Sequence, residues 1–329
     1  MPSWILLALD AMDETFSIVD DGETRSVAGR HRNLARPGPS ALFGEPGLGV
    51  ALGSGGARGL AHVGVIQALL ERGVEPDFAA GSSMGAVIGA AYAAGTFDRL
   101  VETLDSMDAA GAAALFLDVG FMKPGLVTGR RVMDFVAAFV PDTTFESLRI
   151  PFTVMATDLR TGDPVCISRG KLLPAIRASI SIPGVFTPVR RGGALLVDGG
   201  VSSPVPVAAV RGLGAKRVLA VNVDNGRDCP YESHRLPPVV NKAFGVGEKV
   251  RKAVWREFGL LRSGGGSLMD VLSRTVRICE DRIAQWETAR EKPDLVLEPA
   301  VGNIPTMDFT RVDDAVRAGR EAAEALFAG

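Results

Sequence analysis

The sequence predicts an α/β fold with a mainly parallel central sheet and helices on both faces. From residue 48 onward, short apolar runs rich in valine, isoleucine and leucine alternate with stretches of helical periodicity. Glycine-rich turns separate several strands from the helices that follow them, which is typical of parallel strands joined by crossover helices. A content of 47% hydrophobic and 22% charged residues describes a globular protein with a large core.

Composition divides the chain into two parts. Residues 1–46 are predicted to be an N-terminal extension and linker. In it, 4–9 and 15–19 resemble short strands, and 30–45 carry prolines, glycines and arginines typical of irregular chain. Residues 47–329 are predicted to form the main domain.

The main domain begins with two strand–turn–helix units. Strand 48–52 leads through the turn 53–59 into helix 60–71, and strand 74–80 is followed by helix 86–94. The alternation continues with helices 97–107 and 129–139, a hairpin of 152–156 with 164–168, helix 172–180, strand 195–197, helix 204–211, strand 216–223, helices 238–261 and 268–290, strand 295–297 and helix 312–327.

Several classes of function receive no support from composition. A formal net charge of -2 gives no reason to expect nucleic acid. The cysteines and histidines are too scattered for a metal site or a disulfide framework: Cys166, Cys229 and Cys279, and His31, His62 and His234. The N-terminus lacks the basic region of a secretory signal, and no apolar run approaches a membrane span, so a cytoplasmic protein without metal or cofactor is expected.

The pentapeptide 81–85, Gly-Ser-Ser-Met-Gly, is the strongest candidate for a catalytic site. A Gly-x-Ser-x-Gly turn between a strand and a helix holds its serine in a strained conformation, close to a helix N-terminus. Gly81 and Gly85 leave room where a Cβ would clash. Ser83 is therefore the candidate nucleophile, and a Gly/Ser-rich turn without chemistry is the alternative for the pentapeptide alone.

The turn 53–59, Gly-Ser-Gly-Gly-Ala-Arg-Gly, is the second candidate. Successive amides near Gly55 and Gly56 could form a nest for a developing oxyanion. Phosphate binding to a dinucleotide is the rival interpretation. It is disfavoured because Ser54 replaces the first glycine of the motif, and the next strand ends in Ala79-Ala80-Gly81 without the acid that such sites require.

A serine nucleophile needs a base within hydrogen-bond reach. His62 lies inside the first helix and is interpreted as a packing residue. His234 follows Asp198 in the chain order of an α/β-hydrolase triad, but lies in a polar loop. Asp198 ends a strand, and two glycines follow it, so its carboxylate could accept the Ser83 proton directly.

Taken together, the turn 53–59, the turn 81–85 and Asp198-Gly199-Gly200 resemble the patatin-like phospholipases, which use a serine–aspartate dyad. Residues 157–159 and 178–186 resemble the bacterial branch related to the neuropathy target esterase catalytic domain. The resemblance is strong over residues 48–223. Ser54 departs from the glycine more common in the family, but only its amide is needed there.

The resemblance implies a three-layer sandwich that hydrolyses lipid carboxylic esters, such as phospholipids or lysophospholipids. It implies Ser83 as nucleophile, Asp198 as base, and the amides of Gly55, Gly56 and Arg58 as the oxyanion hole. A catalytically silent lipid- or protein-binding module on the same fold is the alternative.

Two stretches could meet lipid. Residues 238–261 form a basic amphipathic pattern, which is compatible with a membrane contact, a lid, or packing on the core or on a second copy of the chain. The apolar stretch 109–122 is a candidate lining for an acyl-chain channel.

Overall fold

The structure is a computed structural model that describes residues 15–20, 23–28, 43, 46–107, 111, 128–224 and 268–328. The expectations for 4–9 and 238–261, and for 30–45 and 109–122 apart from Phe43 and Gly111, lie outside the described residues. Within the described part of the chain, no helix combines the length and apolar content needed to cross a bilayer.

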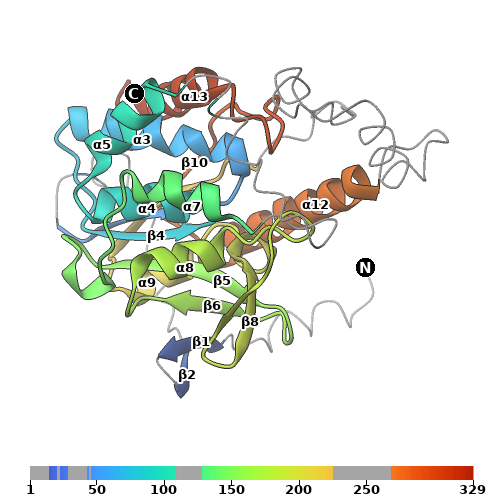
Figure 1. Cartoon of the computed structure of the whole chain (residues 1–329). Coiled ribbons are helices and arrows are strands. Elements are labelled where there is room, and N and C mark those ends of the chain that lie inside the picture. Colours follow the sequence, from blue (N-terminus) through green and yellow to red (C-terminus); the bar gives the residue numbers. More distant parts are fainter. Residues whose placement is uncertain are drawn as a thin grey trace, which may run out of the picture.

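A mixed, mostly parallel sheet forms the centre of the fold (Figure 1). Its main path has the order β10-β9-β3-β4-β5-β6-β1-β2, and β8 pairs with β5 and β7. The strands are β1 (Thr15–Asp20), β2 (Glu23–Ala28), β3 (Leu48–Leu52), β4 (Phe78–Ser82), β5 (Phe152–Asp158), β6 (Pro164–Ile167), β7 (Val189–Arg191), β8 (Ala194–Asp198), β9 (Arg217–Val221) and β10 (Leu295–Leu297).

Helices cover both faces of the sheet, as predicted. The α-helices are α3 (Ala61–Glu71), α4 (Met84–Ala93), α5 (Phe97–Asp105), α7 (Arg130–Ala137), α8 (Leu172–Ser179), α9 (Val207–Gly212), α12 (Leu268–Glu291) and α13 (Val312–Glu324). Short 3-10 turns are η1 (Gly56–Leu60), η2 (Phe145–Ser147), η3 (Gly199–Val201) and η4 (Ala325–Phe327).

Strand β3 shows how the sequence divides the core between the two faces. Its side chains alternate, so Val50 and Leu52 pack into the larger core with α3, α4 and α8. Ala51 faces the smaller core, where α9 and Ala284 of α12 pack. Gly49 also faces α9, and a Cβ there would come within 2.7 Å of Val210. Small residues on this face let α9 lie close to the sheet.

The pairing of β5 brings two strand ends together. Strand β6 pairs with one edge of β5, and the other edge is shared by β4 and β8. Ser82 of β4 lies opposite Met155, and Asp198 of β8 lies opposite the next residue, Ala156. Because β4 runs parallel to β5 and β8 runs antiparallel, their C-terminal ends converge on the same point.

Some predicted boundaries differ from the observed ones. The strand expected at 74–80 begins later, at Phe78 of β4. Asp77, just before it, is not part of the strand because its carboxylate accepts the amides of Gly47 and Leu48 at 2.6 and 3.0 Å and caps the start of β3. Strand β7 was not predicted; it forms an antiparallel hairpin with β8. In the N-terminal extension, β1 forms a hairpin with β2 and pairs in parallel with β6, so this hairpin adds to the sheet.

Candidate active site

The turn between β4 and α4 holds Ser83 in a sparsely populated backbone conformation. Its φ and ψ are 52° and −118°, in a region that costs roughly 1–3 kcal/mol for a residue with a side chain. A Cβ on Gly81 would lie 2.3 Å from the Gly85 carbonyl oxygen, and one on Gly85 would lie 2.1 Å from the Leu52 carbonyl oxygen. Both glycines are therefore required by the close approach of backbone segments.

The backbone of Ser83 is fixed from two directions. Its amide donates to the hydroxyl oxygen of Ser179, at the end of α8, over 2.9 Å. Its carbonyl accepts the amide of Ala86 at 2.9 Å, which starts α4 directly after the serine. The serine thus lies at the N-terminus of α4, where the helix dipole favours negative charge.

The side chains of Ser83 and Asp198 are in direct contact. The Ser83 hydroxyl donates to Asp198 Oδ2 over 2.7 Å, and both residues are buried. The other carboxylate oxygen, Oδ1, accepts the amide of Gly200 at 2.8 Å. The Asp198 amide donates to Ser181 O at 3.0 Å, and its carbonyl accepts the Thr157 hydroxyl at 2.8 Å. The carboxylate is therefore held in one orientation.

Burial raises the pKa of Asp198 from its ordinary value of 3.8 to about 7. The hydrogen bonds from Ser83 and Gly200 oppose this shift, and the nearby charge of Asp224 adds to it. A carboxylate with a raised pKa is a better proton acceptor than an ordinary one, so this site has the chemistry of a general base.

The glycine-rich turn after β3 leaves two amides available. Gly55 and Gly56 have φ values of 155° and 57°. A Cβ on Gly56 would lie 2.3 Å from the Thr306 carbonyl oxygen. Among the described residues, no partner is found for the amides of Gly55 and Gly56, whereas the amide of Arg58 donates to the Gly55 carbonyl at 3.2 Å and that of Ala57 to Thr306 at 2.8 Å. The Arg58 amide, which the resemblance includes in the oxyanion hole, thus has another partner.

The side chain of Arg58 has a structural partner that the sequence did not reveal. Its fully buried guanidinium forms an ion pair with Asp224 and donates to the Thr306 hydroxyl at 3.0 Å. The Ser54 hydroxyl donates to the other Asp224 oxygen at 3.4 Å. This buried pair ties the glycine-rich turn to the residues that directly follow β9.

A further carboxylate lies beside the turn after Asp198. A Cβ on Gly200 would lie 2.6 Å from Glu280 Oε1 of α12 and 2.8 Å from the Ser54 hydroxyl. Burial, with the charges of Asp224 and Asp198, raises the pKa of Glu280 well above its ordinary value, and Arg58 and Arg277 oppose the shift. Sequence reasoning missed Asp224 and Glu280, because neither follows a motif and their proximity depends on the packing of α12.

The histidines divide between the core and the part of the chain outside the described residues. His62 is fully buried, as expected of a packing residue, and its Nε2 donates to the Gly53 carbonyl at 2.8 Å. Desolvation lowers the pKa of His62 to about 4, so it is neutral at pH 7. His234 lies outside the described residues. No group of three or more His, Cys, Asp or Glu that could hold a metal ion occurs in the described ranges.

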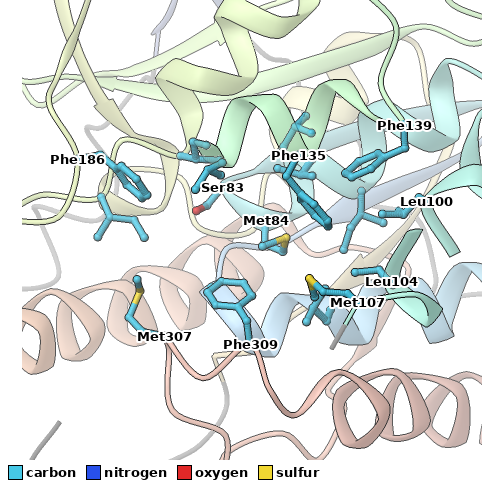
Figure 2. Close-up of a pocket in the computed structure, with 18 residues that line it drawn as sticks. Ser83, Met84, Leu100, Leu104, Met107, Phe135, Phe139, Phe186, Met307 and Phe309 are labelled. Atoms are coloured by element: carbon cyan, nitrogen blue, oxygen red, sulfur yellow. The ribbon is translucent and has the colours of Figure 1, made fainter. Parts of the chain in front are cut away.

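An apolar cavity extends from Ser83 (Figure 2). The Ser83 hydroxyl oxygen points into it, with Phe186 on one side and Phe135 and Phe139 toward the other end. Apart from Gly56 and Ser83, the described residues that line it have apolar side chains, including Met84, Leu100, Leu104, Met107, Phe135, Phe139, Phe186, Met307 and Phe309. Helices α5 and α7, which flank the stretch 109–122, supply much of this lining.

Comparisons with known proteins converge on one family. Residues 50–211 match the family model described as patatin-like phospholipase. An uncharacterized NTE family protein of Mycobacterium tuberculosis is 43% identical over 198 residues, which are 59% of this chain and 55% of that protein. A second is 34% identical over 290 residues, 84% of this chain and 46% of that protein.

A more distant relative carries a name that states an activity. Lysophospholipase NTE1 of Debaryomyces hansenii is 26% identical over 294 residues, 87% of this chain and 18% of that protein. The chain spans about half the length of the two mycobacterial relatives.

Proposed function

Residues 50–211 match the patatin-like phospholipase family, as the motifs predict, and on this premise we propose that the chain hydrolyses carboxylic esters of lipids. Ser83 is the nucleophile and Asp198 the general base. The observation that carries the proposal is the 2.7 Å hydrogen bond from the Ser83 hydroxyl to Asp198 Oδ2, at an apolar cavity.

Acylation follows from this geometry. Ser83 Oγ attacks the ester carbonyl carbon while its proton passes to Asp198 Oδ2. The amides of Gly55 and Gly56 and the N-terminus of α4 stabilise the oxyanion of the tetrahedral intermediate. When the intermediate collapses, the carbon–oxygen bond to the alcohol breaks, and Asp198 returns its proton to the departing oxygen. The acyl group remains on Ser83.

Deacylation repeats these steps with water. Asp198 accepts a proton from a water molecule as the water oxygen attacks the acyl carbon. The same amides stabilise the second oxyanion, and collapse releases the fatty acid and reprotonates Ser83. These steps use only groups of this chain, with no metal or cofactor.

The cavity supports a lipid acyl chain as the occupant. Its apolar lining would desolvate an alkyl chain, and each buried methylene stabilises binding by about 0.8 kcal/mol. We therefore propose a phospholipid or lysophospholipid as the substrate. We also propose that the enzyme is cytoplasmic, contacts the inner membrane face and associates with a second copy of the chain.

Hydrolysis of a lipid panel tests the proposal. Purified full-length protein is incubated with phospholipids, lysophospholipids and neutral glycerides, and released fatty acid is measured by mass spectrometry. We expect release from at least one phospholipid or lysophospholipid. Binding of these lipids without release of fatty acid from any of them would favour the catalytically silent module.

The pH dependence should follow Asp198. Because its pKa is raised to about 7, its carboxyl group is increasingly protonated below that pH and cannot accept the Ser83 proton. We expect kcat/KM on a soluble p-nitrophenyl ester to fall about tenfold for each pH unit below 7.

A histidine base would titrate in a similar range, so the control is His234→Ala measured across the same pH values. The proposal expects the acid limb to be unchanged in this variant. Disappearance of the limb in His234→Ala, or a wild-type limb near pH 4, would contradict the assignment of Asp198.

A further inference from the structure

Three carboxylates of helix α12, those of Glu280, Glu287 and Glu291, lie on the face that meets the rest of the protein. Glu287 accepts the Ser203 hydroxyl at 2.6 Å and the Val205 amide at 2.9 Å. Glu280 lies against Gly200, and Glu291 is buried. Together with the buried Ala284, these residues recur at the three- and four-residue spacing of one helix face. The inward face of α12 therefore holds the chain just after Asp198.

The opposite face of α12 is apolar and exposed. Ile278 and Trp286 are 56% and 63% exposed, and Val271 and Leu272 are 45% and 43% exposed. Val271, Ile278 and Trp286 follow the spacing that places residues on one side of a helix. A surface helix ordinarily shows the reverse pattern, with its apolar face inward and its charges in water. A cluster of large exposed apolar residues marks an interaction surface.

Among the described side chains of α12, those that are both charged and exposed are all positive, and one of them, Arg290, also forms an ion pair with the buried Glu291 at 3.0 Å. Arg274, Arg282 and Arg290 are exposed, whereas none of the acidic residues of α12 whose side chains are described is exposed. A helix with apolar and cationic residues on one side is suited to the boundary between lipid headgroups and acyl chains. Trp286 adds a side chain that favours this boundary. In Figure 1, one end of α12 reaches beyond the sheet and the neighbouring helices.

We propose that the outward face of α12, defined by Val271, Leu272, Ile278, Trp286 and the three exposed arginines, docks on an anionic lipid surface. The inference rests on the proposed function, because docking would bring the protein to the lipid surface that contains its ester substrate. A second copy of this chain is the poorer partner, since two cationic faces would repel each other. Anionic headgroups complement the arginines directly.

This assignment places the docking face close to the dyad. The inward face of α12 contacts the turn that holds the Asp198 carboxylate, through Glu280 and Gly200. A helix with its side chains is about 10 Å across. Docking through the outward face would therefore bring the dyad turn to within about one helix diameter of the lipid surface.

Vesicle flotation tests the docking face. Full-length protein carrying Ser83→Ala, so that no lipid is consumed, is mixed with vesicles of phosphatidylglycerol and phosphatidylcholine or of phosphatidylcholine alone. We expect binding to the anionic vesicles. Ile278→Glu with Trp286→Glu should lower the partition coefficient about tenfold or more, because charge replaces the inserted apolar surface. Arg274→Glu with Arg282→Glu should remove the preference for anionic vesicles.

Leu159→Glu is the matched control, since Leu159 is 53% exposed but lies outside α12. Its vesicle binding should equal that of the parent protein. Melting curves check that all variants are folded. Parent protein that does not bind anionic vesicles, or an Ile278→Glu/Trp286→Glu variant that binds as well as the parent, would overturn the proposal. The proposal would also be overturned if the parent protein forms a dimer in sedimentation experiments but does not bind vesicles, and the Ile278→Glu/Trp286→Glu variant does not form this dimer.

Turnover of water-soluble p-nitrophenyl butyrate, measured without vesicles on protein with Ser83 intact, separates this inference from the proposed function. Absent turnover with normal vesicle binding would contradict the hydrolase alone. Normal turnover without vesicle binding would contradict the docking face alone.

Discussion

Replacing Ser83 by alanine is expected to lower kcat/KM for p-nitrophenyl butyrate by about 10⁴-fold or more, because the variant has no nucleophile to form the acyl-enzyme. The loss should appear in kcat, and melting curves check that the variant is folded.

Ser82 offers a matched control one residue away. It is fully buried, and its hydroxyl has no hydrogen-bond partner within the described residues. Ser82→Ala should therefore keep its activity and its stability, since no bond is lost. Equal loss of activity in both variants would mean that the turn, rather than the Ser83 hydroxyl, is what matters.

Asp198→Asn should lower kcat about 10³-fold or more, because the amide cannot accept the proton from Ser83. The side chain keeps its shape, and its oxygen can still accept the Gly200 amide that now binds Oδ1 at 2.8 Å. The residual rate should lose the acid limb near pH 7. Stopped assays over pH 5–9, with purified variant and native protein in parallel, measure both effects.

Asp158→Asn is the control for this change. Asp158 is also a buried aspartate at a strand end, but its carboxylate accepts the Arg160 amide at 2.9 Å. It should retain native turnover. An Asp198→Asn variant with native kcat and an unchanged pH profile would remove the dyad from the proposal.

The local parts of the site could be predicted because each depends on neighbouring residues. The strand–turn–helix around Ser83 follows from an apolar run, two glycines and a helix of small residues, and the structure contains it. The same is true of the glycine-rich turn at Gly55 and Gly56. The mainly parallel sheet with helices on both faces was also predicted correctly.

The meeting of these parts depends on long-range pairing, which the sequence does not encode in a motif. Asp198 reaches Ser83 because β8 runs antiparallel to β5 and ends one residue beyond β4 on the same edge. No local pattern specifies the direction of β8 or its register with Ala156.

Buried charges were the other feature beyond sequence reasoning. Arg58 was chosen for its amide, but its side chain forms the buried ion pair with Asp224. Glu280 lies on the helix predicted at 268–290, for which no contact with the site was expected, and its position beside Gly200 follows from how α12 packs. Charged residues are mostly exposed in folded proteins, so a prediction from sequence places them on the surface. Only the tertiary structure reveals such buried pairs.

The rate at which a fluorophosphonate probe modifies the protein, with the adduct mapped by peptide mass spectrometry, tests the dyad most directly. The account predicts a single adduct on Ser83 in the native protein, and labelling about 10³-fold slower in Asp198→Asn, because the hydroxyl is activated by that carboxylate. An adduct on another residue, or native labelling rates in Asp198→Asn, would contradict it.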